Sequence, residues 1–119
     1  MAKYLILGAT GGIGEAIAET LHASGHDLHL SGRNADKLAA LSGRLGASHT
    51  VGDVMEAGAI ETIVAEAGDD LAGLVYAIGT INLKPLSKMT MADFSNDFNL
   101  NAASAAKAIQ AALLASKTK

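Results

Sequence analysis

The chain has 119 residues, half of them hydrophobic, and this length accommodates one domain. Nine basic and twelve acidic residues give a net charge of −3 without a basic block, so neither nucleic acid nor a membrane surface is an expected partner. No cysteine is present, which excludes disulfides and thiolate-bound metals and fits a soluble, cytoplasmic protein.

Apolar stretches of strand length alternate with helical patterns, which predicts a parallel sheet covered by helices. We expect strands at Lys3–Leu7, Asp27–Ser31, Ser48–Val51 and Leu71–Ile78, and helices at Ile13–Ser24, Ala35–Leu45, Glu56–Ala67, Met91–Asn99 and Ala102–Ser116. Right-handed crossovers then give the strand order 3-2-1-4. The predicted fold class is therefore α/β, a Rossmann-type doubly wound parallel sheet in three layers, α/β/α.

The first predicted strand runs directly into a glycine-rich turn, which an alanine-rich amphipathic helix follows. Glycines let the backbone turn tightly and approach a ligand, while the free N–H groups at the helix start face phosphates. This order predicts a dinucleotide site; a turn needed only for close strand–helix packing is the alternative. Two spacings are present: G-x-x-x-G-x-G in Gly8, Gly12 and Gly14, and G-x-x-G-x-x-G in Gly8, Gly11 and Gly14.

With these spacings the chain resembles the short-chain dehydrogenase/reductase family. The first spacing occurs in the compact members of that family, and the second occurs in its longer members. The resemblance extends over essentially the whole chain but only about the first half of a full family member. It implies an intact enzyme, a homodimer or homotetramer, that moves a hydride between NADP(H) and a small-molecule carbonyl/alcohol substrate. It also implies that residues 1–119 form the NAD(P)-binding domain, with a cofactor-binding loop made of Gly8, Thr10, Gly11, Gly12, Ile13 and Gly14.

The second predicted strand ends in Ser31-Gly32-Arg33-Asn34. A carboxylate here would bind the adenosine ribose and repel a 2′-phosphate. Arg33 can instead donate two N–H bonds to a phosphate, which favours NADP(H) over NAD(H). Many NADP-preferring relatives carry a second basic residue in the glycine loop, where this chain has Gly11. The alternative is that Arg33 is a solvated residue at a helix start, where Asn34 is the expected cap.

The third and fourth predicted strands each end in a stretch that resembles the family. Asp53 and Val54 match the position whose Asp side chain and following backbone contact the adenine; the alternative for Asp53 is an acid at a helix start. Tyr76-Ala77-Ile78-Gly79 stands where the family often has Asn-Asn-Ala-Gly. By resemblance, the backbone of Ala77 and Gly79 lies at the nicotinamide-side ribose.

Two helices are expected after Pro85, the only proline. Thr90 and Asp93 resemble a capping box at the first of them. Asn101 lies nine positions before Gln110 and aligns with the family's catalytic-helix asparagine, which helps to hold a water in a proton relay. Asn99 is its rival, and a buried or capping asparagine between the helices is the alternative. The same helices resemble those that pair relatives across a dimer.

The histidines are not expected to bind metal. None of them forms an i, i+4 pair on one helix, and no clustered carboxylate completes a site. His26 and His29 are predicted on opposite faces of a strand. We expect all four to be surface or strand-end residues: His22, His26, His29 and His49.

The family's catalytic serine and its Tyr-x-x-x-Lys motif have no match in this sequence. Tyr4 is followed four residues later by Gly8, and Tyr76 by Thr80. We therefore expect the 119-residue chain alone to be inactive and to be part of a longer protein, with its fourth strand an unpaired sheet edge. A non-catalytic NAD(P)-binding module or sensor is the alternative function.

Overall fold

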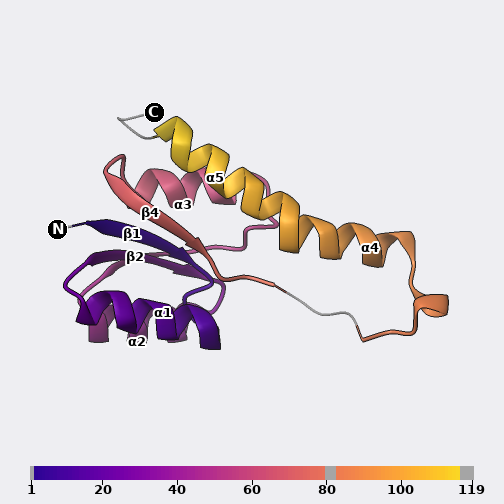
Figure 1. Cartoon of the computed structure of the whole chain (residues 1–119), viewed down its shortest axis with the longest axis horizontal. Helices are drawn as coiled ribbons and strands as arrows, with labels where there is room; N and C mark the ends of the chain where they lie inside the picture. The colour runs from indigo at the N-terminus through magenta and orange to yellow at the C-terminus, as the bar shows by residue number, and fades with distance from the viewer. Residues whose placement is uncertain (1, 80–82, 116–119) are drawn as a thin grey trace.

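The computed structural model describes residues 2–79 and 83–115, and its elements alternate as expected (Figure 1). The strands are β1 (Lys3–Leu7), β2 (Asp27–Gly32), β3 (Ser48–Val51) and β4 (Leu71–Tyr76). The α-helices are α1 (Gly12–Ala23), α2 (Ala35–Leu45), α3 (Ala59–Ala67), α4 (Met91–Phe98) and α5 (Ser104–Ala115). A 3-10 turn, η1 (Leu86–Lys88), precedes α4, and a π-helical segment, η2 (Asn99–Ala103), joins α4 to α5.

The four strands form one parallel sheet in the order β3-β2-β1-β4, which confirms the predicted topology. Helices α1 and α2 cover one face, and α3 and α5 cover the other (Figure 1). Side chains of β1 alternate between the two faces, so Leu5 and Leu7 pack toward α3 and α5 while Ile6 packs toward α1 and α2. The molecule is therefore a three-layer α/β/α sandwich with a core on each side of the sheet.

Most predicted boundaries agree with the structure to within two residues, and α3 is the exception. It begins at Ala59 rather than Glu56, because Gly58 just before it has a φ of +79°. A left-handed residue ends any right-handed helical turn that leads into it. Of the last predicted helix, Ser116 lies outside the described residues. Strand β4 pairs with β1 and lies, as expected, at one edge of the described sheet.

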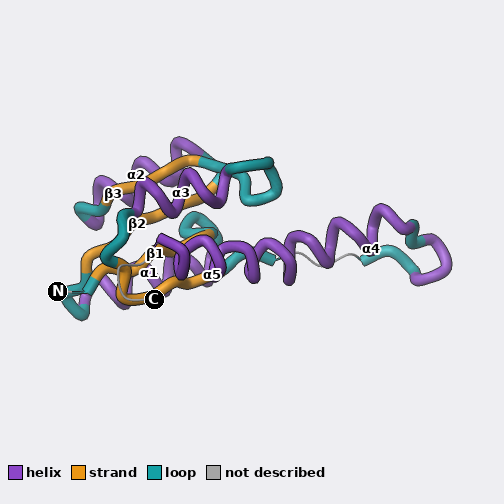
Figure 2. Tube along the Cα trace, turned by 90° about the horizontal axis from the view of Figure 1, so that it is seen from above, coloured by secondary structure: helices purple, strands orange, loops and turns teal. Residues whose placement is uncertain are grey.

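Helices α4, η2 and α5 form one continuous rod whose α4 end projects beyond the sheet (Figures 1 and 2). Two separate helices were predicted here, but Asn99 has helical dihedral angles of −63° and −44°, so the chain does not leave the helix. The predicted capping box is confirmed at its start, where Thr90 and Asp93 cap each other reciprocally. Asn34 likewise caps α2 by accepting from the backbone N–H of Lys37 at 3.0 Å. No helix within residues 2–79 and 83–115 is long and apolar enough to cross a membrane.

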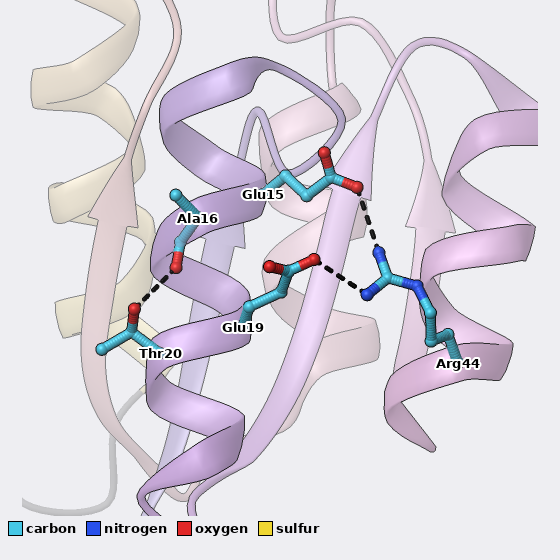
Figure 3. A network of polar contacts seen from close by, with 5 residues as sticks. All are labelled: Glu15, Ala16, Glu19, Thr20 and Arg44. Atoms are coloured by element: carbon cyan, nitrogen blue, oxygen red, sulfur yellow. Dashed lines mark hydrogen bonds and ion pairs between the residues drawn. The ribbon is translucent and has the colours of Figure 1, made fainter.

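Helices α1 and α2 are linked on their outer side by one arginine (Figure 3). Arg44 of α2 donates to Glu19 at 2.8 Å and to Glu15 at 3.1 Å, both on α1, where the Thr20 hydroxyl bonds the carbonyl of Ala16. The three charged side chains are about half exposed, so these pairs contribute little to stability. They do hold the two acidic side chains toward α2.

His29 corrects the expectation that all four histidines lie at the surface or at strand ends. It lies on β2, is only 2% exposed and has its ring beside β3. Both ring nitrogens have hydroxyl partners, Ser48 at 2.7 Å and Thr50 at 2.8 Å. Because the Thr50 hydroxyl donates to Glu66, its oxygen must accept from Nε2–H of His29. The β2–β3 pairing thus supplies the partners that make burial of this imidazole possible. Among the described residues no group of three His, Asp or Glu side chains could hold a metal ion.

The stability of the protein is expected to fall as the pH drops from 7 to 5. Burial lowers the pKa of His29 below its ordinary value of 6.5. Repulsion from Lys3 and His49 lowers this pKa further, and the attraction of Glu66 opposes the shift. Below pH 6.5 the unfolded chain therefore binds a proton that the folded chain does not, and the free energy of unfolding falls with pH. Urea unfolding between pH 7 and 5 measures this slope.

His29→Gln should flatten that slope, and the exposed His22→Gln should leave it as it is. An unchanged slope in His29→Gln would show that other groups control the stability of the protein in this range.

Candidate functional site

A cavity of about 400 Å³ opens at the carboxyl end of the sheet. Its walls come from the loop after β1, the ends of β2 and β4, the segment after β3, and η2. Eight of the residues predicted for the site line it: Gly8, Thr10, Gly11, Arg33, Asp53, Val54, Ala77 and Gly79. These residues are distant in the sequence, and the parallel topology brings them together.

The remaining predicted residues lie beside the cavity rather than in its wall. Gly12, Ile13 and Gly14 form the first turn of α1, and Ile13 is 75% exposed. Asn101 lies in η2, where its Oδ1 is 3.2 Å from the point that a Cβ on Gly79 would occupy. Its amide therefore packs against the residue just after the β4 end.

The glycine loop is held by backbone contacts on three sides. The N–H groups of Gly8 and Ala9 both donate to the carbonyl of Ser31, at 3.0 and 2.9 Å. Gly8 has a φ of +85°, and a Cβ there would lie 2.6 Å from the carbonyl oxygen of Ala77. A Cβ on Gly14 would overlap the carbonyl oxygen of Gly8. Only glycine fits Gly8 and Gly14, because backbone occupies the space of a side chain at both.

Thr10 closes the loop against the end of β2. Its Oγ1 lies 3.0 Å from the position of a Cβ on Gly32, so these two residues are in close contact. The N-cap residue of α1, Gly11, has no side chain to cap the helix. Phosphate oxygens could therefore accept hydrogen bonds from the first N–H groups of α1 without displacing a side-chain cap.

The two predicted adenosine contacts lie next to each other at the cavity wall. Arg33 Nη1 lies 3.9 Å from Asp53 Oδ2, and the Arg33 side chain is 80% exposed. The other carboxylate oxygen of Asp53 accepts from the backbone N–H of Met55 at 2.9 Å, which fixes the acid. An exposed ion pair of this length contributes little to stability. An incoming phosphate would therefore compete readily with Asp53 for the Arg33 guanidinium.

The sequence did not predict Leu100 and Met55 as residues of the cavity wall, nor Tyr76 as a partner of Leu100. The Tyr76 hydroxyl donates to the carbonyl oxygen of Leu100 at 2.5 Å, and Ser104 Oγ lies 3.6 Å from Met55 Sδ. A signal for Leu100 was available, since it directly precedes Asn101. The contact of Tyr76 depends on the path of the helix and has no sequence signature.

A family model and several known proteins are similar to the chain in sequence. A family model described as enoyl-(acyl carrier protein) reductase matches residues 8–119. An uncharacterized oxidoreductase of Mycobacterium tuberculosis is 40% identical over 57 residues, which are 48% of this chain and 23% of that protein. Nodulation protein G of Rhizobium sp. (strain N33) is 52% identical over 44 residues, 37% of this chain and 18% of that protein.

Solved structures share the fold over nearly the whole chain. A short-chain dehydrogenase/reductase from Brucella melitensis, 33% identical, superimposes with a TM-score of 0.86 over 98% of this chain and 52% of its own. An actinorhodin polyketide ketoreductase solved with NADPH, 22% identical, gives 0.89 over 96% of this chain and 47% of its own. The chain thus spans about half the length of these structures. The family match begins at the first glycine of the loop and includes every segment that lines the cavity. The chain therefore belongs to the short-chain dehydrogenase/reductase family.

Proposed function

We propose that this chain binds NADP(H) in the cavity at the carboxyl end of the sheet, as the cofactor-binding part of a short-chain oxidoreductase. One observation carries the proposal: the glycine loop, Arg33 and Asp53 line the same cavity. That cavity lies where β1 has β2 on one side and β4 on the other. Ligands of open α/β sheets bind at such a reversal of strand order.

Each predicted residue has a proposed role along the dinucleotide. The pyrophosphate lies at the loop and first turn of α1, formed by Gly8, Thr10, Gly11, Gly12, Ile13 and Gly14. Arg33 binds the 2′-phosphate, and Asp53 with the backbone of Val54 binds the adenine. Ala77 and Gly79 contact the nicotinamide-side ribose through their backbone, and Asn101 beside Gly79 holds a water of the proton relay.

The bound cofactor supplies a hydride that is exchanged with a carbonyl/alcohol substrate, and the residues of this chain bind and orient that cofactor. The two tyrosines present are not suited to donate the substrate proton. Neither has a lysine four residues later, and burial raises the pKa of Tyr76, whose proton is already donated to Leu100. We therefore propose that these 119 residues do not turn over substrate by themselves. A non-catalytic NAD(P)-binding module or sensor would use the same cavity.

Calorimetric titration with NADPH, NADP⁺, NADH and NAD⁺ tests the proposal. We expect the two phosphorylated forms to bind more tightly, because the exposed guanidinium of Arg33 at the cavity favours a 2′-phosphate. A chain that binds none of the four overturns the cofactor assignment. Binding of NADH as tightly as NADPH overturns the preference alone. We propose a cytoplasmic location on the basis of the cysteine-free composition.

We also propose that a second copy packs on the rod formed by α4, η2 and α5, giving a homodimer or homotetramer. Exposed apolar side chains recur along it: Met91, Phe94, Phe98, Ile109 and Leu113. Phe98→Ser should shift the chain toward monomer in light scattering, while Val51→Ser, an exposed apolar residue on β3, should not. A chain that is monomeric at high micromolar concentration contradicts this expectation.

A further inference from the structure

The π-helical segment η2 forms one wall of the cavity. Leu100 lines the cavity directly, and Asn101 packs against Gly79 at the end of β4. The turn is wider than an α-helical turn, because the N–H of Ser104 bonds to the carbonyl of Asn99, five residues earlier. Such turns are rare and persist where other contacts hold them.

Tyr76 makes a tertiary hydrogen bond to this segment. It is the last residue of β4, and its ring packs on the core between the sheet and helices α3 and α5. Its hydroxyl donates to the carbonyl oxygen of Leu100 at 2.5 Å, across 24 residues of sequence. Burial raises the pKa of Tyr76, and a hydrogen bond with Ser104 offsets only part of this rise. The hydroxyl therefore keeps its proton and remains a donor at neutral pH.

The width of the η2 turn determines where Leu100 and Asn101 point. Each residue of an α-helix advances about 100° around the axis, so converting the π turn to an α turn rotates one side of the rod against the other by about that angle. Such a rotation would move Leu100 out of the cavity wall or Asn101 away from Gly79. A donor that holds the Leu100 carbonyl opposes it.

We propose that Tyr76 is a positioning residue for the cofactor: it fixes η2 to the end of β4 and so holds Leu100 and Asn101 at the nicotinamide end of the cavity. This inference rests on the proposed NADP(H) site. This hydroxyl bonds Leu100 and Ser104 of the rod, whereas Arg33 and Asp53, which form the adenosine end, lie after β2 and β3. Loss of the hydroxyl should therefore affect one half of the dinucleotide and spare the other.

Tyr76→Phe tests the inference in the 119-residue chain, with two ligands. We expect NADPH to bind about fivefold more weakly, the loss of one neutral hydrogen bond. We expect 2′,5′-ADP, which lacks the nicotinamide half, to bind as it does to the unsubstituted chain. Tyr4→Phe is the matched control, because it removes the other tyrosine hydroxyl at the opposite end of the sheet, where the Tyr4 ring packs edge-on against His26.

Hydrogen exchange in the ligand-free protein provides a second measurement. The amides of Asn99–Ala103 should exchange faster in Tyr76→Phe and at the original rate in Tyr4→Phe. Unchanged exchange and unchanged NADPH binding overturn the role of Tyr76, as does an equal loss for both ligands. If the unsubstituted chain binds neither ligand, the proposed function fails, while the exchange rates still decide whether Tyr76 fixes η2.

Discussion

Replacing Gly14 by alanine is expected to lower the free energy of unfolding by about 3 kcal/mol and to abolish NADP(H) binding. The added Cβ would overlap the carbonyl oxygen of Gly8 and approach its carbonyl carbon to 2.8 Å. Both are backbone atoms of a loop that Ser31 and Ala77 hold in place, so no flexible side chain can yield. Urea unfolding and calorimetric titration with NADPH measure the two effects.

Gly12→Ala is the matched control, two residues earlier in the same motif. A Cβ on Gly12 meets nothing within 4 Å, and its φ is not positive. Alanine in this first helical turn should leave stability unchanged or raise it by about 0.5 kcal/mol. Equal destabilisation by the two substitutions would mean that the contact between Gly14 and Gly8 does not limit what this loop tolerates.

Arg33→Ala is expected to weaken NADPH binding by about 10- to 100-fold and to leave NADH binding nearly unchanged. A charge-assisted hydrogen bond from a guanidinium contributes about 1.5–3 kcal/mol, and NADH has no 2′-phosphate to receive it. The structure favours a specific effect, because the only ion pair that Arg33 makes with the described residues is the 3.9 Å contact with Asp53. The difference between the two dissociation constants is the quantity to measure.

The other arginine provides the control for charge. Arg44→Ala removes the same charge, but from the outer side of α2, where Arg44 bonds Glu15 and Glu19 (Figure 3). It should change NADPH binding little at physiological salt, which screens distant charges. If Arg33→Ala retains the preference for NADPH, or Arg44→Ala removes it equally, the 2′-phosphate is not bound by Arg33.

The sheet could be predicted from the sequence because strong local signals agree there with the global fold. Strands β1 and β3 have the predicted bounds, and the caps at Asn34 and Thr90 form as expected. The glycine loop is similarly local, since strand, turn and helix follow one another directly. The strand order followed from the handedness of crossovers, which depends on topology rather than on particular side chains.

The features that escaped prediction depend on contacts between distant residues. His29 resembles a strand-end histidine in the sequence, and only the pairing of β2 with β3 brings Ser48 and Thr50 to its ring. The single wide turn at η2 leaves no signal in the helical periodicity, so two helices were expected where one rod forms. Tyr76 is only a departure from the family's asparagine in the sequence, and its contact with Leu100 depends on where the fold places η2.

The close packing of Gly8 and Gly14 has a consequence for how a ligand would associate with the loop. Because backbone atoms of Ser31, Ala77 and α1 already surround it, the loop loses its conformational entropy when the chain folds rather than when a dinucleotide arrives. A preorganised site of this kind needs little induced fit, so association should approach the rate of unhindered encounter. The same coupling means that substitutions far from the loop which loosen the sheet would also slow recognition.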